Sequence, residues 1–186
     1  ADGTVDYTHD GSETNSDSFT YTIDDLAGNT SNPTTVSVTV APVNDLPTIG
    51  GVDTGAVNED VDPDVDGLIE AAGALTITDP DPGESSFQAE TVAGTYGTLT
   101  IDASGNWHYD AVNSQAAIQQ LDAGESISDT LTVTSADGTP QNVTIIINGS
   151  EDASTIGGTM TGTVTRDAVL TASGHITVTD TDTSDN

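Results

Sequence analysis

The sequence contains no cysteine and almost no basic residue, and each absence excludes a class of function. Without cysteine there is no disulfide, no thiolate nucleophile and no thiolate metal ligand, so the plentiful donors are oxygen atoms, which favour hard cations. Arg166 is the only Lys or Arg against 31 acidic residues, and the formal net charge is -30. Because nucleic acid and anionic membranes bind clusters of Lys and Arg, we exclude both as partners.

Long apolar runs and aromatic residues are also scarce. The sequence has no run of about 18 apolar residues and no charged-then-apolar amino terminus, so we expect neither membrane insertion nor a signal peptide in this segment. Apolar residues make up 33% and aromatic residues 4%, a composition also found in disordered chains. Val, Ile and Leu alternate with Thr, however, and this period of two predicts ordered strands. Because so acidic a fold repels itself, it requires high salt or bound multivalent cations.

An internal repeat organises the chain. Residues 48–51 (Thr-Ile-Gly-Gly) recur as residues 155–158, an offset of 155 minus 48, or 107 residues. Residues 73–81 recur as residues 174–182 with an offset of 101, so the two copies differ in length by six residues. We therefore predict a C-terminal part of one repeat, a complete repeat and an N-terminal part of another, at 1–45, 46–152 and 153–186.

The complete repeat has the pattern of an antiparallel β-sandwich. Short segments of period two are separated by turn signals such as Asp-Gly and Ser-Gly. Strands are expected near Ala56, 75–78, 98–102, 106–109, 129–134 and 142–147. Ile118 and Leu121, three residues apart, predict one helical turn. A period near 100 residues is long enough for a separate core, so the predicted fold is all-β, with tandem immunoglobulin-like antiparallel sandwiches in an elongated chain.

Two bacterial repeat families resemble these segments. Residues 73–81, 105–109 and 121–134 look like the VCBS repeat of large RTX-type surface adhesins. Residues 17–21 and 42–47 are similar to the bacterial cadherin-like repeats of the same proteins. This resemblance implies cadherin-like sandwiches in a calcium-stiffened extracellular rod on the bacterial surface.

The cadherin resemblance also implies calcium at the two junctions between repeats, where loops bring together the roughly six to eight oxygen ligands that calcium requires. The ligands implied at the first junction are Asp17, Asn44, Asp45, Asp79, Asp81 and Asp137. Those implied at the second junction are Glu59, Asp129, Glu151, Asp152, Asp180 and Asp182. Asp45 precedes Asp79 by 34 residues, and Asp152 precedes Asp180 by 28, so the pairing recurs with the same six-residue difference. The alternative for the aspartates that follow strands is a role in turn formation.

The six-residue insertion carries Asp62, Asp64 and Asp66 before Gly67, which matches the opening of an EF-hand loop. The twelfth position is Gly73 in place of a bidentate Glu, and no flanking helices are predicted, so we reject an EF-hand. A sandwich loop with one extra calcium and a solvated acidic turn both stay open.

No catalytic motif is present: the sequence has no Gly-x-Ser-x-Gly, no His-Glu-x-x-His and no phosphate-binding loop with Lys. His9, His108 and His175 are far apart and predict no zinc cluster. We therefore predict a non-enzymatic, calcium-stiffened stalk segment of a secreted or surface-anchored adhesin, with neighbouring repeats as partners and an undefined adhesive target. The alternatives are a metal-free sandwich screened by high salt, and a module whose Trp107 and Tyr109 bind carbohydrate or a cell surface. A buried Trp107 would favour the stalk.

Overall fold

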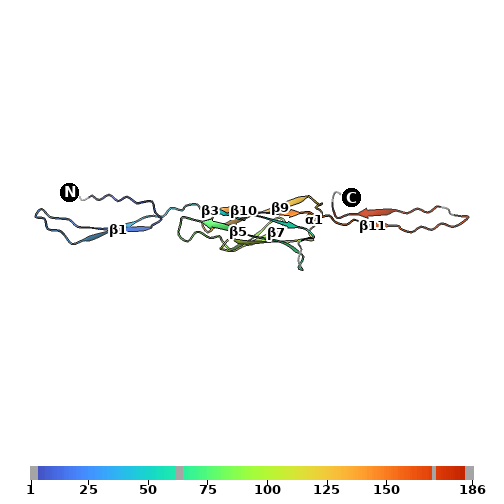
Figure 1. Cartoon of the computed structure of the whole chain (residues 1–186), viewed down its shortest axis with the longest axis horizontal. Coiled ribbons are helices and arrows are strands. Elements are labelled where there is room, and N and C mark those ends of the chain that lie inside the picture. The colour runs from blue at the N-terminus through green and yellow to red at the C-terminus, as the bar shows by residue number, and fades with distance from the viewer. Residues whose placement is uncertain (1–3, 62–64, 169–170, 183–186) are drawn as a thin grey trace.

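The computed structural model describes residues 4–61, 65–168 and 171–182, and its regular secondary structure is nearly all strand. Three parts follow one another along an elongated chain (Figure 1). The first part is a hairpin of β1 (Ser16–Tyr21) and β2 (Thr34–Thr39), and the last pairs β11 (Thr155–Gly158) with β12 (Ile176–Thr179). Between them lies a β-sandwich. The predicted fold class is confirmed.

Two sheets form the sandwich. The smaller sheet has the order β4 (Thr54–Asn58), β10 (Pro140–Asn148) and β9 (Ser126–Thr134). The larger sheet has the order β3 (Thr48–Gly51), β5 (Leu68–Thr78), β8 (Asn106–Val112), β7 (Gly97–Ile101) and β6 (Glu90–Ala93). All neighbouring pairs are antiparallel except β4 and β10, which are parallel. Among the residues described, no helix has the length and apolar character needed to cross a membrane.

Each expected strand is present, and the predicted helical turn is α1 (Ala116–Gln119), which buries Ile118. The structure adds β3 and β6, and it extends β5 back from Leu75 to Leu68. The extension was missed because Ala and Gly occupy inward positions of this half of β5, which weakens the apolar alternation. These small residues leave room for a large side chain on the neighbouring strand β8.

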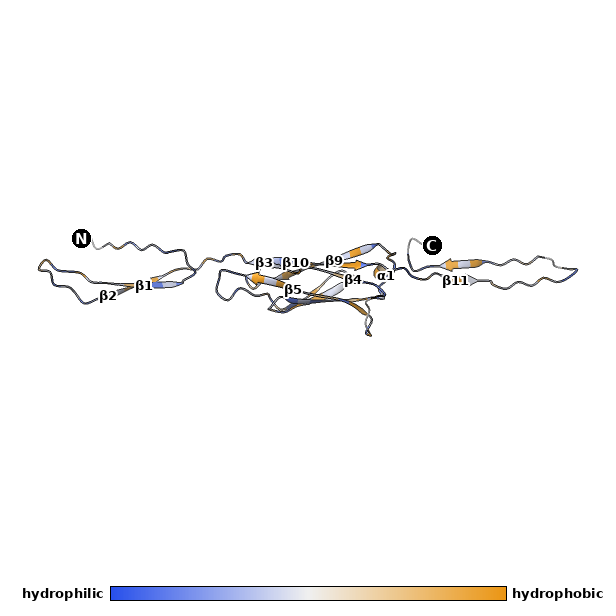
Figure 2. Cartoon of the chain, viewed as in Figure 1, coloured by the Kyte–Doolittle hydropathy of each residue, from blue (hydrophilic) through white to orange (hydrophobic). Residues whose placement is uncertain are grey.

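That large neighbour is Trp107, the only tryptophan, which lies in the core between the sheets and is 2% exposed. Its Nε1 donates a hydrogen bond of 2.7 Å to the carbonyl of Val52. The smaller sheet contributes the alternating, fully buried Val143, Ile145 and Ile147. Apolar residues are concentrated on the strands (Figure 2), as an alternating core requires.

Gly73 is expected to be intolerant of a side chain because the indole of Trp107 occupies its space. A Cβ at Gly73 would lie 2.4 Å from Cζ2 of Trp107. We expect Gly73→Ala to lower the free energy of unfolding by about 1–3 kcal/mol, as overpacking does. Urea denaturation followed by Trp107 fluorescence measures this. Gly50→Ala is the control because its Cβ would lie at an ordinary 3.4 Å from Thr76, and equal effects at both positions would contradict the packing argument.

Backbone residues with positive φ recur with the same spacing as the sequence repeat. Gly51 and Gly158 have φ of 93° and 97°, and Asp60 and Asp167 have φ of 56° and 62°. Both pairs are separated by the same 107 residues (158 minus 51, and 167 minus 60). A left-handed conformation is uncommon for a residue other than glycine, although Asp tolerates it better than most, so its recurrence supports equivalent local folds.

The outer parts lack the enclosing second sheet. Leu75 in the sandwich is 2% exposed, whereas the equivalent Ile176 in β12 is 64% exposed. The equivalent of the buried Val57 is Val164, which is also exposed. Two strands alone do not enclose a core, so the ordered core of the described chain lies in the middle sandwich.

Candidate metal centre

Three carboxylates converge where β5 ends. Asp79, Asp81 and Glu84 each offer an oxygen within 4.8 Å of the others, and we call them the N-terminal cluster. The turn after β5 builds the group: the N–H of Asp81 donates to Asp79 Oδ1 at 2.8 Å, and the N–H of Glu84 donates to the Asp81 carbonyl at 3.3 Å.

The linker is attached to this cluster through its backbone. The N–H of Asp45 donates a hydrogen bond of 2.7 Å to Oδ2 of the buried Asp81. Within the described residues, Asp79 Oδ2 and Glu84 Oε2 are buried and have no hydrogen-bond partner. A buried carboxylate oxygen without a donor is costly, and several of them facing one another are more so. This arrangement has the chemistry of a cation site made of oxygen ligands.

Electrostatics link further residues to the N-terminal cluster. Burial raises the pKa of Glu84, and the charges of Asp81, Asp79 and Asp137 raise it further. Hydrogen bonds, led by that of the Ser135 hydroxyl and including one from Asn44, lower the pKa of Asp137. The structure therefore brings together the predicted Asn44, Asp45, Asp79, Asp81 and Asp137.

Sequence analysis missed Glu84. The signal that could have identified it is the Pro82-Gly83 turn, which reverses the chain directly after Asp81 and returns the next acid toward it. The repeat offset of 101 residues also places an acid, Asp185, at the equivalent position of the last part (185 minus 84). Asp185 lies outside the described residues.

The second junction repeats the hydrogen bonds of the first. The N–H of Asp152 donates to Asp182 Oδ2 at 2.8 Å, and the N–H of Asp182 donates to Asp180 Oδ1 at 3.2 Å. Asp182 is buried, whereas Glu151 is exposed. The predicted pairing of a linker acid with Asp-x-Asp is thus present in both places.

Two acids of the sandwich, Glu59 and Asp60, face this second linker. Glu59 is buried and accepts a 2.9 Å hydrogen bond from the N–H of Ser150. Asp60 Oδ1 accepts hydrogen bonds from Asn113 Nδ2 at 2.7 Å and Gln119 Nε2 at 3.0 Å. We call Glu59, Asp60, Asp152 and Asp182 the linker cluster. Asp60 was absent from the predicted ligands, although its recurrence as Asp167 marked the position.

The four acids of the linker cluster interact with one another. Burial raises the pKa of Glu59, and the charges of Asp60, Asp152 and Asp182 add to this. Burial raises the pKa of Asp152, as does its hydrogen bond with Asp60. The pKa of Asp60 is lowered, first by Gln119 and then by Asn113. The charges on the two sides of the linker therefore act on one another.

These shifts predict an unusual pH dependence without metal. Glu59 and Glu84 have raised pKa values in the folded chain. They therefore stabilise the fold most below the ordinary pKa of 4.5, and this stabilisation is lost as the pH rises through their folded pKa. Carboxyls with lowered pKa, such as Asp60, contribute above 3.8 and lose their contribution as the pH falls. In chelator, we expect stability to rise from neutral pH to about pH 4.5 and then to fall. Urea midpoints across this range test it, and a steady rise toward neutral pH would contradict it.

Asp129, a predicted ligand, is held by donors of the sandwich itself. This residue is 2% exposed, and its carboxylate accepts hydrogen bonds from the N–H groups of residues 95–97 and from the Tyr109 hydroxyl. Burial alone would raise the pKa of Asp129, but these hydrogen bonds outweigh burial and lower it. The oxygens of Asp129 are thus used by the β6–β7 turn, and its role as a calcium ligand stays a prediction.

Asp17 and Asp66 accept hydrogen bonds from residues outside the two clusters. Asp17 is exposed and accepts hydrogen bonds from the Tyr7 hydroxyl and the Ser18 N–H. Asp66 accepts a hydrogen bond from the Leu68 N–H. Asp62 and Asp64 lie outside the described residues, so an additional calcium in this loop stays a prediction.

The family of the chain follows from a match to the sandwich that carries these clusters. A family model of the bacterial cadherin-like domain matches residues 44–149, more than half of the 186 residues. The chain belongs to the bacterial cadherin-like domain family. The predicted cadherin-like family is thus confirmed, on the middle repeat that we compared with VCBS repeats, whereas residues 17–21 lie outside the match. The boundaries of the three predicted parts stay predictions.

Comparisons with individual proteins are more distant. No curated protein matches the chain. Among solved structures, a Ca²⁺-stabilised adhesin that helps an Antarctic bacterium bind ice has 21% sequence identity and a TM-score of 0.29. The alignment covers 77% of this chain and 34% of that adhesin, so the bacterial cadherin-like chain spans about a third of that protein's length.

Proposed function

We propose that this chain is a calcium-stiffened extender segment of a bacterial surface adhesin, outside the cell and without a catalytic role. The observation that carries the proposal is the pair of buried carboxylate oxygens in the N-terminal cluster, Asp79 Oδ2 and Glu84 Oε2, which have no hydrogen-bond partner in the described chain. The recurrence of the same linker geometry around Asp182 supports it.

Calcium suits these sites because every charged donor in both clusters is a carboxylate. Hard cations prefer such oxygen ligands, and loops of a sandwich supply them from separate segments. Extracellular modules bind calcium in the range of roughly 0.1 to 1 mM. The sites would therefore be filled outside a cell and empty in a bacterial cytosol, so the chain would stiffen only after export.

The linker cluster explains how binding would stiffen the chain. Glu59 and Asp60 are held at the end of the sandwich by Ser150, Asn113 and Gln119. Asp152 of the linker donates its N–H to the carboxylate Oδ2 of Asp182 in the last part. Calcium supplies the positive charge that these facing carboxylates lack. Acids on both sides of the linker would then hold one orientation, with neighbouring repeats as the partners.

The buried Trp107 favours this extender over the carbohydrate-binding alternative, because an indole in the core offers no face for a sugar.

Small-angle scattering in calcium and in chelator tests the proposal. We expect calcium to narrow the distribution of interatomic distances and to increase the maximum dimension, because the linker becomes stiff. The double variant Asp152→Asn and Asp182→Asn should lose this change. Asp17→Asn, which removes an exposed charge outside both clusters, should retain it. An equal response in potassium chloride with chelator would instead support the salt-screened, metal-free sandwich.

A further inference from the structure

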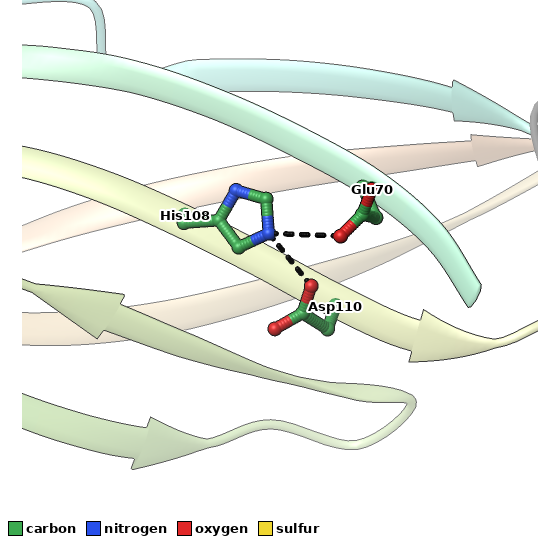
Figure 3. A group of neighbouring side chains, drawn as sticks. All are labelled: Glu70, His108 and Asp110. Carbon is green, nitrogen blue, oxygen red and sulfur yellow. Dashed lines mark hydrogen bonds and ion pairs between the residues drawn. The ribbon is translucent and has the colours of Figure 1, made fainter. Parts of the chain in front are cut away.

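A separate group of metal-ligating side chains lies on the outer face of the larger sheet (Figure 3). His108 Nε2 is 3.1 Å from Glu70 Oε1 and 2.7 Å from Asp110 Oδ1. We call these residues the β5–β8 triad. The side chains of His108, Glu70 and Asp110 are 45%, 38% and 34% exposed, so solvent reaches all three.

Strand register assembles the triad. Glu70 on β5 lies directly opposite Asp110 on β8, and His108 precedes Asp110 by two residues on the same strand. Because a strand alternates its faces, residues 108 and 110 point outward while the buried Trp107 and Tyr109 point into the core. The three side chains therefore meet on one rigid surface.

The charges of this arrangement would be balanced by a cation. Carboxylates directly opposite each other on neighbouring strands repel, and Glu70 and Asp110 form such a pair. The Nε2 of His108 faces both, but one nitrogen carries only one proton and cannot donate fully to two acceptors. A divalent ion bound to all three ligands would neutralise both carboxylates.

The ligand spacing fits a transition metal. In the tetrahedral geometry that zinc prefers, bonds of about 2.0–2.2 Å to nitrogen and oxygen place neighbouring ligand atoms about 3.4 Å apart. His108 Nε2 lies 3.1 Å from Glu70 and 2.7 Å from Asp110, so the two carboxylates would move outward by less than about 1 Å to admit the ion. An imidazole ligand favours zinc, copper or nickel over calcium, so this site differs in chemistry from the oxygen-only clusters.

The triad is specific to the middle repeat. By the repeat offset of 101 residues, Thr171 occupies the position of Glu70. In the first part, where residues 3–7 align with 105–109, Asp6 corresponds to His108 and Thr8 to Asp110. The repeated fold does not use these three residues, so their convergence is an addition to it.

We propose that Glu70, His108 and Asp110 form a surface site for a borderline divalent metal ion of the zinc class. Water completes the coordination from the exposed side. The site works independently of the calcium clusters at the two ends of the sandwich, and it adds a second, chemically distinct cation to the rod.

Zinc titration of the full chain in saturating calcium tests the site. Nuclear magnetic resonance of the three imidazoles should show one equivalent of zinc shifting His108, with His9 and His175 unchanged. By calorimetry, His108→Gln should weaken binding of this equivalent at least tenfold, and Glu70→Gln and Asp110→Asn should each weaken it. The control variants His9→Gln and His175→Gln should bind as the parent does.

Two readouts separate this proposal from its alternatives. His108→Gln should leave calcium binding unchanged, so failure of the zinc site and failure of the calcium proposal are distinguishable. Because the three side chains are on the surface, the metal-free variants should melt within a few degrees of the parent. Equal zinc-induced shifts at all three histidines, or retention of the site in His108→Gln, would overturn the proposal in favour of diffuse binding to an acidic surface.

Discussion

Asp129→Ala is expected to destabilise the middle sandwich by about 3–5 kcal/mol, because it removes a buried acceptor that several donors share. The N–H groups of residues 95–97 and the Tyr109 hydroxyl all donate to this carboxylate. A buried group that loses its partner bears the desolvation cost without compensation. Urea denaturation followed by Trp107 fluorescence measures the loss.

The repeat offers a matched control for this change. Asp17 aligns with Asp129 at an offset of 112 residues (129 minus 17), but it is exposed in the two-stranded first part. Asp17→Ala should change the stability of the sandwich by less than about 0.5 kcal/mol. A small effect of Asp129→Ala, equal to that of Asp17→Ala, would show that the buried hydrogen bonds contribute little.

The same residue separates a structural carboxylate from a metal ligand. Asp129→Asn, which retains an acceptor oxygen, should bind the same number of calcium ions as the parent chain. Loss of a calcium site in this variant, measured by calorimetry under conditions where it is folded, would show that Asp129 is a calcium ligand, as predicted from the sequence.

Asp81→Asn should be less stable than the parent chain in calcium but not in chelator. In calcium at about one hundred times the dissociation constant, binding adds about 2.7 kcal/mol to the folded parent, and the variant should lose most of this. In chelator the variant should be as stable as the parent or more stable, because repulsion among Asp79, Asp81 and Glu84 is relieved. Thermal unfolding with calcium and with chelator measures both.

The control for this prediction removes the same charge elsewhere. Asp53 is exposed and belongs to neither cluster. Asp53→Asn should retain the full calcium stabilisation. If Asp53→Asn and Asp81→Asn behave alike, calcium acts by screening the overall charge of -30, and the N-terminal cluster is not a specific site.

The two clusters are expected to affect different properties, so the proposal for one can be contradicted while the proposal for the other is supported. The N-terminal cluster is built on the sandwich that holds the core, so its occupancy affects the stability of that sandwich. The linker cluster joins acids on both sides of a junction, so its occupancy affects orientation. If calcium stabilised the sandwich without stiffening the chain, calcium binding would be supported and the extender mechanism would be contradicted.

The junction architecture could be predicted from sequence because it depends on spacing along the chain. A linker acid followed by Asp-x-Asp after a strand recurs with a six-residue difference, and the structure contains the same linker hydrogen bond in each copy, from Asp45 to Asp81 and from Asp152 to Asp182. Alternation of Val, Ile and Leu likewise identified most strands, since a period of two needs only local sequence.

The composition of each site depended on contacts that spacing does not encode. Glu84 joins Asp79 through a reversing turn, whereas Asp129, predicted as a ligand, is occupied by a turn more than 30 residues away in sequence. Whether an acid is a ligand or a structural acceptor depends on which donors the fold places beside it.

By itself, the sequence determined an all-β, repeated and strongly acidic chain that needs cations, because charge, periodicity and repeat length are properties of residues in order. Only the tertiary structure decided that Trp107 is buried, that Asp60 faces Asp152, and that Glu70 meets His108 and Asp110. Each of these depends on cross-strand register and on packing between sheets, and a shift of one residue would turn the same side chains to opposite faces.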